Sequence, residues 1–417
     1  MAVMLSLLSA GRIQNQRNRT MHEIRDIASD NAKRALDRQA EEVERLHDSG
    51  AKMFRAVQLL KRKPYSQPII HDEKQRVVIN PADQQAFIIK HYESQFHDKS
   101  LPDIPQFLGD PSPLPNQITS SEVRRAFQSL NNGRAAGPDH LSGELLKYSP
   151  PIVAEMTSDI LNRAIETHDP LEVGRGTLIL LQKPGKPLGP LTSTRPIVLL
   201  SALRKTLSLI VLKRIQPAVD QYLATSQSAF RRGRSTSDVV WCHRWLCSMT
   251  QRFNTSIHIL GIDMSKAFDT VRRDVLMKIL ESFLQESELR MIRILLTETW
   301  LEPRVKGASK SSFKTNIGVP QGDSLSPVLF TIYLEAALRD LRQELPSRPA
   351  VDNDLPLDIA DDVDFVSRDE TFLSEVEQHA PTVLARWNLN ANPSKTEHTT
   401  VARFPIGTKK RGVLSAN

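Results

Sequence analysis

Cysteine is scarce in this chain. Only two are present among 417 residues, Cys242 and Cys247. A secreted scaffold of this size usually carries more, so we expect a reducing compartment. The pair flanks His243, but two further ligands at zinc-site spacing are missing beside it. We therefore interpret both cysteines as core thiols close to Trp241 and Trp245.

Long hydrophobic runs are also missing. The apolar start, residues 1–8, is too short to cross a bilayer, and it has neither a basic leading region nor a clear cleavage site. We expect no membrane contact and no secretion, which leaves an intracellular protein of the nucleus or cytoplasm. The sequence has no internal repeat and no low-complexity tract, and it does not indicate an oligomeric state.

Positive charge is in excess. The formal net charge is +7, and 40% of the residues are hydrophobic, enough for a sizeable core. A length of 417 residues predicts more than one domain or one large unit with several lobes. The charge suits a polyanion such as RNA or DNA, although many basic proteins bind neither.

Local patterns predict alternating helices and strands. Thr119 and Glu122 form a capping box ahead of Val123, Phe127 and Leu130 on one helical face, and Gly133 can end that helix. Further helices are expected over residues 1–63, 83–96, 141–148, 201–215, 275–283 and 326–344. Strands are expected over 68–70, 76–79, 177–181 and 257–262, and a hairpin over 355–365. A separate proline-rich loop is expected at 101–115.

Acidic residues stand at two distant places. Asp263 follows a buried strand, and Asp361 and Asp362 lie at the predicted hairpin tip. Carboxylates brought together in a sheet can hold the two Mg²⁺ ions that phosphodiester synthesis uses. Taken singly, each position favours the plainer interpretation, in which Asp263 caps a helix and Asp361 and Asp362 form a solvated turn. The Gly-rich loop from Gly318 to Pro327 between them favours nucleotide chemistry.

Several segments resemble reverse transcriptases of non-LTR (LINE-type) retrotransposons, in the same order along residues 50–400. The segments Gly261–Asp269, Gly318–Pro327, Ile359–Phe365 and Asn392–Glu397 resemble motifs A, B, C and D of that family. Upstream, Gly133–Asp139, Arg195–Ile197 and Gln227–Thr236 resemble its fingers segments. Many motifs in one order make this resemblance specific.

The resemblance implies a role for each matching residue. Asp263, Asp361 and Asp362 would bind the metal ions and carry catalysis. Phe268 would select deoxynucleotides by rejecting a 2′-hydroxyl, although a lone Phe is more often plain core.

The remaining roles concern the triphosphate, base and template. Lys183 and Arg195 would contact the triphosphate, and Gln321 and Gly322 would lie against the base and template. Lys395 would lie near the leaving pyrophosphate as a general acid.

The same resemblance implies the fold and the reaction. We expect an α+β right-hand polymerase with fingers and palm, the palm being an antiparallel sheet backed by helices. The expected domains are a helical N-terminal extension (1–100), the fingers and start of the palm (101–262), the palm (263–400) and a basic tail (401–417). The reaction would be RNA-directed DNA synthesis with two Mg²⁺ ions, which Mn²⁺ can replace, an RNA template, a DNA primer and dNTPs.

This sequence departs from the family pattern in three places. Ile359 replaces the usual aromatic residue of motif C, and Ala136 and His140 replace proline and glycine in the fingers turn. The chain stops at Asn417, soon after motif D, so we expect the thumb to be missing. Two alternatives therefore stay open: a weak or inactive remnant that folds and binds RNA, and another palm-bearing nucleotidyl transferase.

Overall fold

The structure is a computed structural model, which describes residues 67–403 apart from 73, 170, 346–354 and 360–361. For residues 355–359 and 362 it describes the backbone alone. The helix predicted within 1–63 and nearly all of the predicted basic tail therefore lie outside the described residues. The described residues belong to one compact unit that begins at Gln67. Within them, no helix combines the length and the apolar character needed to cross a bilayer.

The smaller of two sheets has four strands in the order β2-β1-β4-β5. Their bounds are β1 Arg175–Gln182, β2 Thr194–Leu200, β4 Thr299–Pro303 and β5 Phe313–Thr315. β1 pairs antiparallel with β2 and parallel with β4. Helix α3 (Pro81–Phe96) covers this sheet, because its buried Ile88, Tyr92 and Phe96 share a core cluster with Leu178 and Leu180.

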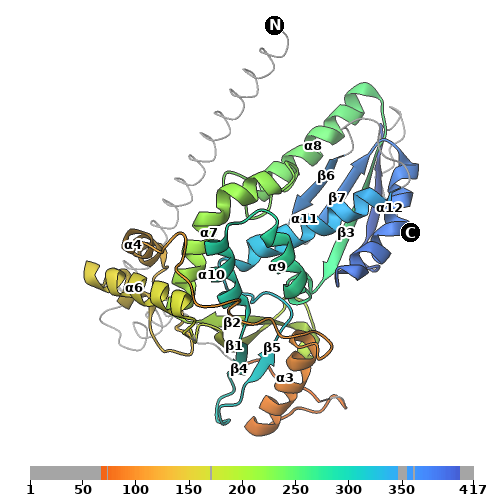
Figure 1. The fold of residues 1–417 in the computed structure, drawn as a ribbon. Helices are drawn as coiled ribbons and strands as arrows, with labels where there is room; N and C mark the ends of the chain where they lie inside the picture. Colours follow the sequence, from red (N-terminus) through yellow and green to blue (C-terminus); the bar gives the residue numbers. More distant parts are fainter. Residues whose placement is uncertain (1–66, 73, 170, 346–354, 360–361, 404–417) are drawn as a thin grey trace, which may run out of the picture. The chain divides into compact units, whose positions relative to one another are not determined.

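The larger sheet has five strands, with the path β6-β7-β3-β8 and β9 paired to β3. Their bounds are β3 Ile257–Ser265, β6 Leu355–Ile359, β7 Asp362–Ser367, β8 Asn390–Ala391 and β9 Glu397–Val401. All of its pairings are antiparallel. Helix α12 (Glu370–Arg386) packs on β3 and β7, and α11 (Ser326–Glu344) packs on α12 (Figure 1). This is the antiparallel sheet backed by helices that the sequence predicts.

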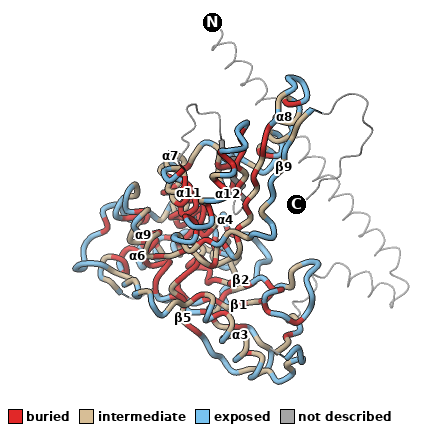
Figure 2. Tube along the Cα trace, turned by 90° about the vertical axis from the view of Figure 1, so that its right-hand side faces the viewer, coloured by how far each residue is buried: buried red, intermediate tan, exposed pale blue. Residues whose placement is uncertain are grey.

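The remaining helices join the two sheets. They are α4 Ser120–Ser129, α5 Gly143–Lys147, α6 Pro151–Thr167, α7 Ala202–Tyr222, α8 Thr236–Phe253, α9 Arg273–Glu281 and α10 Glu286–Leu296, with short 3₁₀ turns η1 Leu191–Ser193 and η2 Ala267–Asp269. Buried residues gather where α7 and α11 lie (Figure 2). The capping box of Thr119 and Glu122 is confirmed, and Arg214 of α7 bonds both oxygens of that Glu122, which fastens α4 to α7.

Three local expectations are wrong. Residues 68–70 and 76–79 form isolated bridges, Ile70 to Gly189 and His71 to Val77, because each finds only one partner residue. The helix before Gly133 already ends at Ser129, so that glycine caps nothing.

The cysteines and tryptophans of α8 are less buried than expected. Cys242 and Cys247 are half-buried free thiols, and Trp241 and Trp245 are 57% and 48% exposed. The two indoles stack on each other with ring centroids 6.3 Å apart. Because the described core covers only one side of α8, both rings stay largely on its outer face.

Candidate functional site

The register of the larger sheet brings the predicted acidic positions together. Ile257, Ile259 and Ile262 favour an extended backbone, and β3 continues through Asp263. In the pairing of β3 with β7, Asp263 lies directly opposite Asp362. Such partners have Cα atoms about 4.5–5.5 Å apart. Asp361 lies outside the described residues. For Asp362 the structure describes the backbone alone, which gives its position in the sheet.

The carboxylate of Asp263 forms an ion pair with Lys395. The Lys395 ammonium lies 2.9 and 3.0 Å from the two carboxylate oxygens of Asp263. The Asn392 side-chain amide donates to the same carboxylate at 3.2 Å, and its backbone N–H donates to the Asp263 carbonyl at 2.8 Å. The sequence indicated the lysine but gave no role to Asn392. These bonds hold the Asp263 carboxylate in place, and the contact with the Lys395 ammonium is charge-assisted.

Phe268 lies just beyond β3, in the turn that leads away from Asp263. The chain turns at Lys266, whose φ is +54°, and enters η2. The Phe268 ring is half-buried and stacks on Phe330 of α11, with centroids 4.6 Å apart. Its carbonyl accepts a bond of 2.9 Å from the Val319 N–H. The residue is therefore held by α11 and by the Gly-rich loop at once.

The loop from Gly318 to Pro327 is bonded to the small sheet and to the segment that follows β3. The Gly318 N–H donates to the Val271 carbonyl, and the Val198 N–H of β2 donates to the Gln321 carbonyl at 2.8 Å. A Cβ at Gly322 would lie 2.5 Å from the Val198 carbonyl oxygen, and this residue has a φ of +126°. Only glycine fits such an approach in that conformation. The loop thus fixes the small sheet against the segment that follows Asp263.

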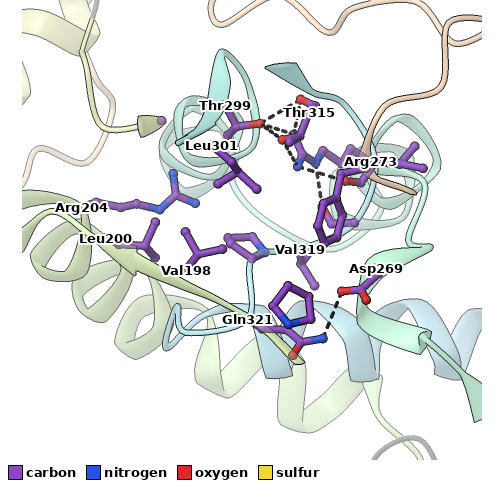
Figure 3. Close-up of a pocket in the computed structure, with 16 residues that line it drawn as sticks. Val198, Leu200, Arg204, Asp269, Arg273, Thr299, Leu301, Thr315, Val319 and Gln321 are labelled. Carbon is purple, nitrogen blue, oxygen red and sulfur yellow. Dashed lines mark hydrogen bonds between the residues drawn. The ribbon is translucent and has the colours of Figure 1, made fainter. Parts of the chain in front are cut away.

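Asp269 joins this arrangement as a buried carboxylate that the sequence did not single out. It is 3% exposed, and one of its oxygens accepts a bond of 3.0 Å from the Gln321 side chain (Figure 3). The other oxygen accepts a bond of 2.9 Å from the Gln95 side chain. Burial raises the pKa of Asp269 to about 6, against the opposing pull of Gln321 and Lys266. Because Gln95 and Gln321 are distant in sequence, no local pattern could have revealed the contact.

A buried arginine secures the other side of the loop. The Arg273 guanidinium donates to the Thr299 hydroxyl at 2.6 Å (Figure 3). It also donates to the carbonyls of Gly318 (2.7 Å) and Leu296 (2.8 Å). Burial lowers the pKa of Arg273 to about 9, and the charge of Arg204 acts in the same direction. Its many acceptors are what make a charge tolerable in the core.

Positive charges gather at the turn between β1 and β2. Arg195 of β2 pairs in register with Leu181, and Lys183 follows β1 with its ammonium 3.0 Å from the Thr192 carbonyl. Desolvation lowers the pKa of Lys183, and the charges of Arg195 and Lys266 lower it further. Cations that repel one another in this way would gain from an anion between them.

A family model described as "Reverse transcriptase (RNA-dependent DNA polymerase)" matches residues 181–413. The chain is 24% identical over 331 residues to a probable RNA-directed DNA polymerase from transposon BS of Drosophila melanogaster, covering 76% of this chain and 36% of that protein. It is 22% identical over 297 residues to the RNA-directed DNA polymerase from mobile element jockey of the same species, covering 68% and 32%.

Among solved structures, the chain is similar to apo telomerase from Candida tropicalis truncated from its C-terminal domain. The identity is 16%, the TM-score is 0.44, and the match covers 56% of this chain and 51% of that one. The chain spans about a third of the length of the two fly polymerases, at 36% and 32%. The family model covers more than half of the sequence, including the strand that ends near Asp263 and the loop bonded to it, and on this ground the chain belongs to the reverse transcriptase family.

Proposed function

We propose that this chain is the RNA-directed DNA polymerase domain of a non-LTR retroelement. It would add dNTPs to the 3′-hydroxyl of a DNA primer on an RNA template. The observation that carries the proposal is the pairing of Asp263 with Asp362 across β3 and β7. The Gly-rich loop supports it, because its bonds to Phe268 and Val271 attach it to the segment just after Asp263.

The acidic residues would hold divalent metal, which reverse transcriptases generally use. Asp263 fits this role because it is a carboxylate in register with Asp362. The Lys395 ammonium on its oxygens would give way to the ion. With Asp361 and Asp362 it would bind two Mg²⁺ ions, or Mn²⁺ in their place, through the oxygen ligands that these ions prefer. When bound, the ions supply Lewis acidity at the attacking hydroxyl and the leaving oxygen.

Phe268 and Gln321 would line the place of the incoming nucleotide. Phe268 would exclude a 2′-hydroxyl by its bulk, and its stacking on Phe330 supports a fixed ring position. Gln321 and Gly322 would lie against the base and template. Asp269 would act as a positioning residue, because it accepts a hydrogen bond from the Gln321 amide.

Lys183 and Arg195 would bind the triphosphate. Their mutual repulsion with Lys266 supports this, since a polyanion would relieve it. Arginine suits the task because its planar fork can bond two phosphate oxygens. Lys395 would serve the leaving pyrophosphate as a general acid, which requires its ammonium to leave the Asp263 carboxylate.

The proposed domains are those that the resemblance implies. Residues 101–262 would form the fingers and the start of the palm, and 263–400 the palm, between an extension (1–100) and a basic tail (401–417). β4 and β5 of the second segment complete the small sheet begun by β1 and β2 of the first. Work on RNA, a DNA primer and dNTPs predicts an intracellular protein, in the nucleus or cytoplasm.

Primer extension on poly(rA)/oligo(dT) with Mg²⁺ tests the proposal. Replacing Asp263 by Asn removes a charged metal ligand while preserving the side-chain shape. We expect the extension rate to fall about 1000-fold, or about 4 kcal/mol of transition-state stabilisation. The matched control is Asp159→Asn, the same chemical change at an exposed position of α6, which should extend primers like the parent chain.

Two outcomes would count against the proposal in different ways. Extension by Asp263→Asn at the parent rate would show that the metal-site assignment is wrong. A parent chain that binds primed RNA but never extends it would favour the inactive remnant. Unfolding curves of both variants separate a loss of chemistry from a loss of fold.

A further inference from the structure

A second cluster of metal-ligating side chains lies at the other end of β3. His258 of β3, His398 of β9 and Glu370, the first residue of α12, each offer a ligand atom, and these atoms all lie within 4.8 Å of one another. His258 stands five residues before Asp263 on the same strand, so about 17 Å separates the two places. The cluster is therefore distinct from the proposed polymerase site.

The pairing of β3 with β9 explains why the two histidines meet. His258 lies opposite Thr400, and His398 is two residues away from that partner on the same strand. Diagonal neighbours of this kind face the same side of a sheet. The two imidazole rings have centroids 6.0 Å apart, and α12 packs on β3, which brings Glu370 to them.

The buried member of the cluster is already oriented. His258 is only 8% exposed, and its Nδ1 lies 3.1 Å from the Thr400 hydroxyl. A hydrogen bond at one ring nitrogen is how proteins usually orient a metal-binding imidazole, with the other nitrogen toward the ion. The other two members, Glu370 and His398, are exposed side chains that can adjust to an ion.

We propose that His258, Glu370 and His398 form a structural Zn²⁺ site. Two imidazoles and one carboxylate suit Zn²⁺ and fit poorly the all-oxygen octahedron that Mg²⁺ demands. In tetrahedral zinc the ligand atoms lie about 3.3 Å apart, so a cluster whose atoms lie within 4.8 Å of one another would contract by at most about 1.5 Å. A water molecule would complete the shell.

The site would fasten α12 and β9 to β3. β9 begins at Glu397, two residues after Lys395, whose ammonium bonds Asp263. Zinc would thus anchor the strand that directly follows this lysine. The proposal does not depend on polymerase activity, because both its ligands and its readouts lie away from Asp263.

Zinc titration of the metal-stripped full chain tests the site. We expect one tight Zn²⁺ per chain by calorimetry, a rise in the melting temperature on zinc addition, and the visible absorption of tetrahedral Co²⁺ when cobalt replaces zinc. Glu370→Gln and His398→Ala change exposed side chains, so both should fold. Each should weaken Zn²⁺ binding at least tenfold and remove the cobalt absorption.

Two controls sharpen the result. His379→Ala removes a histidine from the same helix α12, nine residues beyond Glu370, and should bind Zn²⁺ like the parent. Asp263→Asn should also keep the zinc, which separates this site from the polymerase metals. Absent binding, or binding that Glu370→Gln and His398→Ala leave unchanged, would overturn the proposal.

Discussion

Asp269 is a carboxyl group placed where its charge is costly. It is 3% exposed, and the amides of Gln95 and Gln321 bond its oxygens. Burial raises the pKa of Asp269 from the ordinary 3.8 to about 6. The Asp269 carboxyl group therefore keeps its proton up to a higher pH in the folded chain than in the unfolded chain.

This shift predicts a pH-dependent stability. For an acid whose pKa is raised by folding, stability is highest below the unfolded pKa and falls as pH rises through the folded one, here between about pH 4 and about pH 6. The loss at neutral pH from this group is about 3 kcal/mol. The variant Asp269→Asn lacks the titration. Its free energy of unfolding relative to the parent should therefore rise by about that amount from low to neutral pH.

Urea unfolding of parent and variant at a series of pH values measures the difference. Asn also presents an amide to the Gln95 or Gln321 amide, which costs about 1–3 kcal/mol at every pH and shifts the whole curve. A difference that stays constant across the range would mean that Asp269 titrates near its ordinary value in the folded chain.

Residues with a local signature were the ones that sequence reasoning could place. Asp263 was found because a β-branched run precedes it, and Phe268 and Gln321 because short motifs carry them. Asp269 and Gln95 were missed as partners, since their contact depends on how α3 meets η2. The exposure of Trp241 was misjudged for a similar reason, because burial depends on what packs against α8.

At the scale of elements, the Gly-rich loop depends on one close approach to β2. Gly322→Ala would put a Cβ 2.5 Å from the Val198 carbonyl oxygen at a φ of +126°. Because the obstacle is backbone, we expect a loss of about 3 kcal/mol or more in the free energy of unfolding. Gly185→Ala has a φ of +71° but open space around the new Cβ, and should cost only about 1–2 kcal/mol.

Urea unfolding measures both losses. Gly185→Ala adds backbone strain alone, whereas Gly322→Ala adds backbone strain and a steric clash with β2. Equal losses would mean that the loop can move away from β2 without cost. Primer extension should fall with Gly322→Ala and not with Gly185→Ala, since only the first displaces Gln321.

A buried ion pair joins α7 to the same loop. The Arg204 guanidinium lies 2.9 Å from the Asp323 carboxylate, and both side chains are at most 2% exposed. Asp323→Ala leaves a buried charge that, among the described residues, keeps a side-chain bond to the Val173 carbonyl at 3.1 Å. We expect a loss of about 3–5 kcal/mol in stability.

Removing both charges should restore much of that loss. The double variant Arg204→Met with Asp323→Ala has no unpaired charge, so it should be more stable than Asp323→Ala alone. The pair of Arg290 with the exposed Glu286, 3.8 Å apart, is the comparison: Glu286→Ala should cost under about 1 kcal/mol. A double variant as unstable as the single one would show that packing, not charge, dominates at this place.

At the scale of the whole molecule, the excess of positive charge predicts salt-dependent binding. The formal net charge of +7 suits a primed RNA template. If about four phosphates are contacted, affinity should fall ~100-fold between about 50 and about 200 mM salt. Filter binding of a labelled RNA–DNA hybrid across this range gives the slope. Affinity that does not change with salt would rule out a phosphate-dominated interface.

Element order was largely predictable and the sheets were not. The capping box at Thr119, the strand ending near Asp263 and the hairpin at 355–365 follow from local patterns, and all three are present. The parallel pairing of β1 with β4 and the pairing of β3 with β9 join segments far apart in the chain. The hydrophobic periodicity of a sequence predicts that a segment is a strand, but it does not indicate which other strand pairs with either edge.

The pairing of β3 with β9 has a consequence for biosynthesis. Ile257 finds Val401 as its partner, so one flank of the central strand waits until nearly the whole described chain has left the ribosome. During translation that flank is an unpaired edge, which invites association between nascent chains. Late closure also means that Lys395 reaches Asp263 only as β9 docks. A polypeptide released from the ribosome before that point would keep this edge of β3 unpaired.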